Sequence, residues 1–154
     1  MRRIAIFIST TGYVGLFPFA PGTVGSLVGV ALYVLLGLDD SMLAEMMTVL
    51  LIGTLGIWAS RIAEDHFRCI DPGPVTIDEV FGMLISLAML NVGWSGLVLA
   101  FFLFRFFDIV KIYPSAKLER IEGGVGIMAD DALAGLYTNI TLRMVLWFFP
   151  QWLV

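Results

Sequence analysis

Four long apolar stretches alternate with polar segments rich in glycine and proline. The apolar stretches are Val24–Leu38, Met42–Ser60, Val80–Val110 and Ala132–Pro150. An α-helix rises about 1.5 Å per residue, and the hydrocarbon core of a membrane is about 30 Å thick. By this measure the second and fourth stretches are long enough to span a bilayer, and the first is long enough with its flanking residues. The pattern predicts membrane-embedded helices.

The third apolar stretch is too long for one span. Its length would be roughly 46 Å as a single helix, and the turn-forming segment Asn91–Gly96 interrupts it. We therefore expect a hairpin of two shorter helices, Glu79–Leu90 and Trp94–Val110. The prediction is an all-α fold, a polytopic membrane bundle of about five membrane-embedded helices in a single domain covering residues 1–154.

The composition narrows the class of protein. Hydrophobic residues make up 59% of the chain and charged residues 14%, with a mean hydropathy of +0.93. These values exclude intrinsic disorder and disfavour an ordinary soluble domain, although a very apolar soluble helical bundle stays an alternative. The net charge of −4 gives no electrostatic basis for binding nucleic acid. The single cysteine, Cys69, cannot form an internal disulfide.

The basic residues predict an orientation, because lysine and arginine near the ends of membrane helices favour the cytoplasm. With the N-terminus inside, only Arg143 lies elsewhere, and the first outer turn carries Asp39 and Asp40. The aromatic residues of Trp147–Trp152 are typical of an outer membrane surface. After the basic start only five apolar residues follow, too few for a signal peptide. The expected cytoplasmic residues are Arg2, Arg3, Arg61, Arg68, Arg105, Lys111, Lys117 and Arg120.

The same orientation gathers three polar segments on the cytoplasmic side, and the first, Thr10–Ser26, leads directly into an apolar helix. Glycine lets backbone N–H groups approach an anion, and hydroxyl groups at a helix N-terminus add donors where the partial charge is positive. Thr23, Gly25 and Ser26 are therefore candidate phosphate-binding residues. An ordinary capped helix start has a similar composition, and the Gly-Lys-Ser/Thr of a P-loop does not follow.

The second polar segment, Arg61–Glu79, ends with two adjacent acids. A carboxylate at the mouth of a membrane helix is costly unless it is solvated, paired or bound to a cation. Asp78 and Glu79 are therefore candidate metal ligands, although acids also stabilise a helix N-terminus. Adjacent residues do not share a helix face, so the pattern allows one acid to bind while the other caps the helix.

The third polar segment, Asp108–Asp131, combines charges of both signs. Arg105, Asp108 and Lys111 recur every third residue on one helix face, as expected for an ion-pair ladder or for a phosphate clamp. A glycine-rich turn then precedes Asp130 and Asp131. Hard carboxylate oxygens suit Mg²⁺ rather than Zn²⁺, and one histidine with one cysteine argues against a His/Cys metal site.

Taken together, these motifs resemble the phosphatidylglycerophosphatase A family, from about Gly12 to Gly135. The resemblance implies a bacterial inner-membrane, Mg²⁺-dependent phosphatase that converts phosphatidylglycerophosphate to phosphatidylglycerol. The orientation predicted from the basic residues puts its active site on the cytoplasmic side. The motifs that carry it are Phe-Pro-Phe-Ala-Pro-Gly-Thr-Val-Gly-Ser, Ile-Asp-Glu-Val-Phe-Gly, Phe-Arg-Phe-Phe-Asp-Ile-Val-Lys and Gly-Gly-Val-Gly-Ile-Met-Ala-Asp-Asp-Ala-Leu-Ala-Gly, in that order.

One position departs from the family pattern. The family typically has Lys-Pro-x-Pro after the Asp-containing helix, whereas this chain has Lys111-Ile112-Tyr113-Pro114. Losing the first proline affects the expected conformation of this loop more than its chemistry, because Lys111 and Pro114 are kept.

The expected mechanism is metal-assisted hydrolysis at the cytoplasmic surface of the membrane, where a lipid substrate presents its phosphates. Arg105 and Lys111 are expected to bind phosphate oxygens. Asp108 is a weaker metal candidate, because it can simply pair with these two basic residues. The side chains expected to hold Mg²⁺, and with Lys111 to act in catalysis, are Asp78, Glu79, Asp130 and Asp131.

Other chemistries fit the sequence less well. Val75 stands where a Cys-x5-Arg phosphatase based on Cys69 would need arginine, no Asp-x-Asp pair supports an aspartyl-phosphate enzyme, and one histidine is too few for a paired-histidine acid phosphatase. A transport or channel component stays open as an alternative, but its charges should lie deeper within the spans. A non-catalytic lipid-binding membrane protein also stays open, and phosphate release by the purified protein would discriminate among the three.

Four further polar residues have ordinary interpretations. We expect His66 and Cys69 to be solvated or in the core rather than catalytic. The Asn139-Ile140-Thr141 glycosylation pattern lies inside a predicted span, so we expect no modification there. Arg143 should either extend outward to the membrane surface or face the bundle interior.

Overall fold

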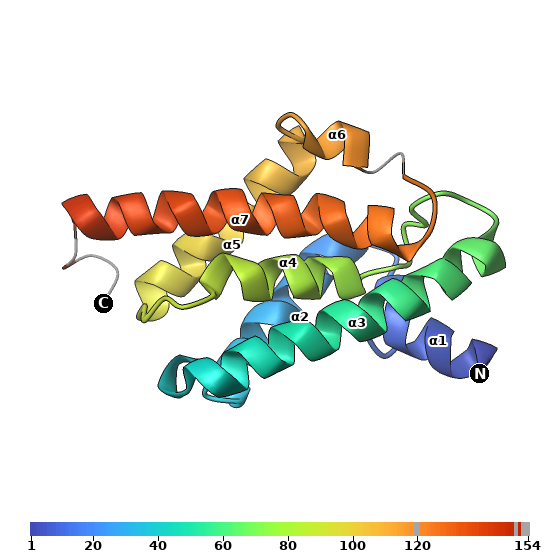
Figure 1. Ribbon diagram of the computed structural model, residues 1–154, viewed down its shortest axis with the longest axis horizontal. Helices are drawn as coiled ribbons and strands as arrows, with labels where there is room; N and C mark the ends of the chain where they lie inside the picture. The colour runs from blue at the N-terminus through green and yellow to red at the C-terminus, as the bar shows by residue number, and fades with distance from the viewer. Residues whose placement is uncertain (119–120, 150, 152–154) are drawn as a thin grey trace.

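The computed structural model describes residues 1–118, 121–149 and 151, and its regular elements are all helical (Figure 1). The predicted all-α fold is confirmed, since no strand occurs in this part of the chain. The elements are α1 (Arg2–Ser9), η1 (Val14–Leu16), α2 (Pro21–Leu35), η2 (Leu38–Asp40), α3 (Met42–Phe67), α4 (Ile77–Leu87), α5 (Trp94–Val110), α6 (Ser115–Leu118) and α7 (Gly124–Phe148).

The long helices form an antiparallel bundle around α4. Helices α2, α4 and α7 begin at one end of the molecule, and α3 and α5 begin at the other (Figure 1). Helix α4 packs against α2, α3, α5 and α7, and it supplies much of the buried apolar core through Val80, Met83, Leu84 and Leu87. Because α4 is enclosed by four neighbours, its first turn is held in a fixed position.

The predicted helix boundaries differ from the observed ones mainly at the polar ends. Helix α5 covers the predicted range, whereas α3 continues past Ser60 to Phe67 and α7 begins at Gly124 rather than at Ala132. An apolar run does not mark the polar or glycine-rich ends of a helix: residues 61–67 of α3 are largely polar, and residues 124–131 of α7 include the glycines that were expected to form a turn. The predicted end of the last span at Pro150, and the basic residue Arg120, lie outside the described residues.

Two smaller boundary errors occur in the first span and in the hairpin. Helix α2 covers Pro21–Leu35 instead of Val24–Leu38, because proline is favoured in the first helical turn. Helix α4 covers Ile77–Leu87 instead of Glu79–Leu90. Its last turn is capped from α7, where the Asn139 amide donates to the carbonyl of Ala88 at 2.8 Å and Arg143 donates to the same oxygen at 3.1 Å. Arg143 therefore extends over the end of α4, but its side chain is exposed, so the structure does not place it in the bundle interior.

One helix of the described chain, α3, is long and apolar enough to cross a membrane, and α2 is a shorter apolar helix. Helix α4, with 11 residues, would extend only about 16 Å. The five-span arrangement therefore stays a prediction. Of the basic residues that the structure describes, all but Arg143 belong to α1, to the last turns of α3 and α5 and the residues just after them, or to α6.

Candidate active site

Four helix ends meet at the end of the bundle where α2, α4 and α7 begin and α5 finishes (Figure 1). Asp78 and Glu79 lie in the first turn of α4, and Asp131 lies two turns into α7. Carboxylate oxygens of these three residues all lie within 4.8 Å of one another. We call Asp78, Glu79 and Asp131 the acidic centre. Both adjacent acids of α4 thus point to one place, although the sequence pattern allows one of them to serve only as a helix cap.

A second group shares one member with the acidic centre. Asp108 at the end of α5 and Asp130 on α7 also place oxygens within 4.8 Å of those of Asp131. All five predicted carboxylates therefore converge, with Asp131 common to both groups. The structure shows that these carboxylates lie close together. The assignment of particular carboxylates to a metal stays a prediction.

Two glycines fix the spacing of the acidic centre. The Cα of Gly135 on α7 lies so close to the carbonyl oxygen of Gly82 on α4 that a methyl group would collide with it. A methyl group on Gly82 would likewise lie 2.6 Å from the carbonyl oxygen of Asp131. Because residues four apart share a helix face, this close contact one turn onward brings Asp78 and Asp131 opposite each other.

The acidic centre has unsatisfied acceptors. Asp78 and Asp131 are only 7% and 5% exposed, yet Oδ1 of Asp78, Oε2 of Glu79 and Oδ2 of Asp131 accept no hydrogen bond from the residues that the structure describes. Buried carboxylates without partners are strongly unfavourable. Each of these three converging carboxylates carries an orphaned hard oxygen, the type of ligand that a divalent cation such as Mg²⁺ prefers, so the residues fit such an ion.

Burial also raises the pKa of two of these groups, Asp78 and Asp131, which lie near the ends of α4 and α7 where these helices begin. For Asp78, loss of hydration is the largest cause of the raised pKa. For Asp131, burial raises the pKa well above its usual range, and the negative charges of Asp78 and Asp108 raise it further. A cation placed among the oxygens would remove this penalty, because it favours the ionised forms.

Two basic side chains flank the carboxylates. Arg105 Nη1 lies 2.7 Å from Asp108 Oδ2, and Lys111 Nζ lies 2.9 Å from Asp130 Oδ2. Lys111 therefore extends to α7 and pairs with Asp130, whereas an ion-pair ladder along α5 would pair it with Asp108. The left-handed backbone of Lys111, with φ +48°, ends α5 and turns the side chain toward α7.

Helix α2 forms the remaining wall. Gly25 and Ser26 lie inside α2, and the backbone N–H groups of Thr23 and Val24 donate to the carbonyl of Ala20. The Ser26 hydroxyl donates to the Gly22 carbonyl at 2.9 Å and accepts from Arg105 Nη1 at 3.5 Å. Of the three predicted phosphate-binding residues, Ser26 is thus in contact with the site. Phosphate binding by Thr23, Gly25 and Ser26 stays a prediction.

Gly25 and Gly22 have packing roles that the sequence did not reveal. A methyl group on Gly25 would lie 3.1 Å from the Thr76 carbonyl oxygen, so this glycine lets α2 approach α4. Gly22 was not among the predicted site residues. A methyl group there would collide with Glu79 Oε1 and lie 3.0 Å from Arg105 Nη1. The Pro-Gly sequence at the start of the helix indicates close packing in this region. It does not indicate which side chains pack against Gly22.

The remaining polar residues lie outside the site. His66 and Cys69 are exposed, as expected for solvated residues, and His66 Nδ1 lies 2.6 Å from Arg2 Nη2. Asn139 is buried and bonded to α4 carbonyls.

The sequence is similar to those of several known proteins. The sequence profile of the phosphatidylglycerophosphatase A family matches residues 7–146. A Bacteroides thetaiotaomicron protein named "Putative phosphatidylinositol-3-phosphatase" is 39% identical over 94% of this chain and 94% of its own length. Proteins named "Phosphatidylglycerophosphatase A" are 38% identical in Haemophilus influenzae (83% of this chain, 80% of the relative) and 32% identical in Escherichia coli (79% and 72%). No solved structure matches the chain.

The family match and the relatives show that the chain is a phosphatase that hydrolyses phosphoric monoesters. More particularly, the chain belongs to the phosphatidylglycerophosphatase A family. The predicted family is confirmed.

Proposed function

We propose that this chain removes the terminal phosphate of phosphatidylglycerophosphate and releases phosphatidylglycerol and inorganic phosphate. The observation that carries the proposal is the acidic centre, with its three orphaned oxygens, next to Arg105 and Lys111. The names of the Haemophilus and Escherichia relatives support the choice of substrate. One catalytic domain covering residues 1–154 would carry out the reaction.

Mg²⁺ is the proposed cofactor, held by Asp78, Glu79 and Asp131. When bound, the ion would neutralise negative charge on the phosphate oxygens. Asp130 and Asp108 are weaker candidates for metal ligands, because each already has a basic partner at 2.9 Å or less. In this assignment Asp130 and Asp108 hold Lys111 and Arg105 in place beside the phosphate.

The basic residues bind and orient the substrate phosphate. The Arg105 guanidinium and the Lys111 ammonium donate to its oxygens, and these charge-assisted bonds strengthen as charge develops in the transition state. A water oxygen forms the new bond to phosphorus, the bond from phosphorus to the glycerol oxygen breaks, and that oxygen takes up a proton. Ser26 fixes the orientation of Arg105 through its hydroxyl.

A membrane location supports this substrate. Large apolar side chains are exposed along the outer faces of the bundle, such as Leu43 and Leu50 on α3, Phe102 on α5 and Met144 on α7. An apolar surface of this extent suits a lipid environment. We propose that the bundle lies in the bacterial inner membrane, with the active site on the cytoplasmic side, where the positive-inside rule puts the basic residues.

A phosphoinositide is the second candidate substrate, because the Bacteroides relative is named after one. Both substrates carry a phosphate monoester on the headgroup of a lipid, so the same acids and bases would serve either. Headgroup selectivity would then depend on side chains around the acidic centre.

The test is phosphate release by the purified protein in detergent with Mg²⁺. We expect turnover of phosphatidylglycerophosphate to exceed that of phosphatidylinositol 3-phosphate, and glycerol 3-phosphate, which lacks acyl chains, to be a poor substrate. Faster turnover of the inositol lipid would overturn the proposed substrate. Release from neither lipid would overturn the proposed function.

A further inference from the structure

An apolar groove of about 450 Å³ runs along α3 on the side facing α4. Met46, Leu50 and Ile57 of α3 form one wall, and Phe81 of α4 and Met89 form the other. From Met46 to Ile57 a helix rises about 16 Å, close to the ~15 Å depth of one membrane leaflet. The groove is therefore as long as the acyl chain of a lipid in that leaflet.

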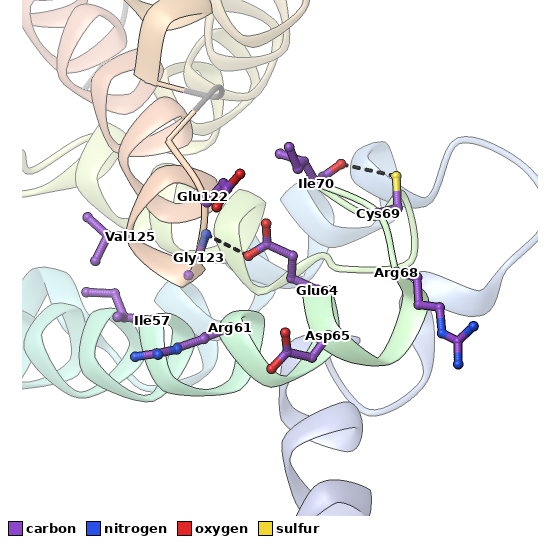
Figure 2. A pocket seen from close by; sticks show the side chains of 11 residues that line it. Ile57, Arg61, Glu64, Asp65, Arg68, Cys69, Ile70, Glu122, Gly123 and Val125 are labelled. Atoms are coloured by element: carbon purple, nitrogen blue, oxygen red, sulfur yellow. Dashed lines mark hydrogen bonds between the residues drawn. The ribbon is translucent and has the colours of Figure 1, made fainter.

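A charged cavity of about 780 Å³ continues from the groove, and Ile57 lines both (Figure 2). The cavity lies between the last turns of α3 and the start of α7. Glu64 Oε2 accepts a hydrogen bond from the Gly123 N–H at 2.6 Å across it. One face of α3 lines first the groove and then the cavity. The residues on this face follow helical spacing, at positions 46, 50, 57, 61 and 64 or 65.

The charges in the cavity follow a definite order. Arg61 comes first after the apolar groove, and its side chain extends toward Ile57 in Figure 2. Asp65 and Glu122 lie farther from the groove and are exposed, and the side chain of Arg68, which also lines the cavity, extends away from these carboxylates in Figure 2. Arg61 forms no hydrogen bond or ion pair with any residue that the structure describes. From the groove toward the outer end of the cavity, a ligand would therefore contact first apolar side chains, then the unpaired Arg61, and then the carboxylates of Asp65 and Glu122.

We infer that this groove and cavity bind one glycerophospholipid whose headgroup carries a phosphate followed by a primary ammonium, as in phosphatidylethanolamine. One acyl chain lies in the groove, the phosphate accepts from Arg61, and the ammonium donates to Asp65 or Glu122. A purely anionic headgroup would place its charge beside three carboxylates. A cation without an acyl chain would leave Arg61 and the groove unused.

This lipid site is separate from the acidic centre, because none of its residues belongs to that centre. The bound lipid is a phosphodiester and is not a substrate for monoester hydrolysis. The inference rests on the proposed membrane location and not on the phosphatase chemistry, so each can fail without the other.

The test is native mass spectrometry of the full chain in detergent with added phosphatidylethanolamine, phosphatidylglycerol or phosphatidylcholine. We expect one phosphatidylethanolamine per chain, retained at least about fivefold better than either other lipid, because only its headgroup has both the phosphate and N–H donors. Equal retention of all three lipids, or preference for phosphatidylglycerol, would overturn the inference.

Matched variants locate the site. Arg61→Gln should lower the retention about tenfold, whereas Arg3→Gln, an exposed arginine outside the cavity, should leave it unchanged. Thr54→Trp should fill the groove and displace the lipid, whereas Leu51→Trp on the exposed surface beside it should not. Thermal melting checks folding, and phosphate release should stay within about threefold of wild type in all four. If Arg61→Gln and Arg3→Gln retain the lipid equally, the site is wrong.

Discussion

Asp131 is the residue on which the proposed site depends most, because its carboxylate belongs to both acidic groups. Asp131→Asn keeps the size of the side chain and removes the charge that holds the cation. We expect a folded protein whose turnover of phosphatidylglycerophosphate collapses, since the charge of the ion is the main stabiliser of the phosphoryl transition state. Phosphate release and thermal melting are the measurements.

Three exposed residues serve as controls for Asp131→Asn. Asp40→Asn at the opposite end of the bundle, His66→Ala and Cys69→Ala should keep turnover within about threefold, a barrier change of roughly 0.6 kcal/mol. A folded Asp131→Asn protein with nearly normal turnover would remove this residue from the metal site and leave Asp130 as the ligand on α7.

The raised pKa values of Asp78 and Asp131 predict how pH affects metal binding. A carboxyl whose pKa is higher in the folded state stabilises the metal-free protein below its unfolded pKa, and this contribution is lost as pH rises through the folded pKa. Mg²⁺ needs the ionised carboxylates, so it must displace protons at low pH. We expect the rise in Tm caused by Mg²⁺ to be larger at about pH 8 than at about pH 6. A Tm shift independent of pH would contradict the assignment of these two acids.

Among the elements, the contact between α4 and α7 sets the distance between the acids. Gly135→Ala would put a methyl group against the Gly82 carbonyl oxygen, and neither backbone can yield without separating the helices. We expect a loss of about 1–3 kcal/mol in the free energy of unfolding together with weaker Mg²⁺ binding. Urea unfolding and calorimetric titration with Mg²⁺ are the measurements.

Gly73→Ala is the matched control, because a methyl group there meets no atom within 4 Å. It should change neither stability nor Mg²⁺ binding. Equal effects of the two substitutions would show that the helix contact does not position the acidic centre.

The sequence predicted elements better than their relation to one another. Apolar length located α3 and α5, whereas the glycine-rich segment that was expected to form a turn before Asp130 is the first turn of α7. Local spacing could not indicate that Lys111 pairs with Asp130 instead of Asp108, because that pairing depends on how α5 ends and where α7 passes. The role of Gly22 was missed for the same reason: its neighbours, Glu79 and Arg105, are distant in sequence.

For the bundle as a whole, the distribution of basic residues predicts which end faces the cytoplasm. In a Cys69→Ala background, Asp40→Cys should react with a membrane-impermeant thiol reagent added outside intact cells, and Lys117→Cys should not. The two sites lie on η2 and α6, and all basic residues that the structure describes, apart from Arg143, belong to the end that includes α6. The opposite labelling pattern would reverse the orientation, and labelling of both would exclude a membrane between them.

The proposed function requires that the acidic centre holds a divalent cation during phosphate release, and metal depletion tests this requirement. Protein purified in detergent and stripped with EDTA should release no phosphate from phosphatidylglycerophosphate. Turnover should return with Mg²⁺ or Mn²⁺ and not with stoichiometric Zn²⁺, because the centre offers only oxygen ligands. Full turnover in metal-free buffer would contradict the account.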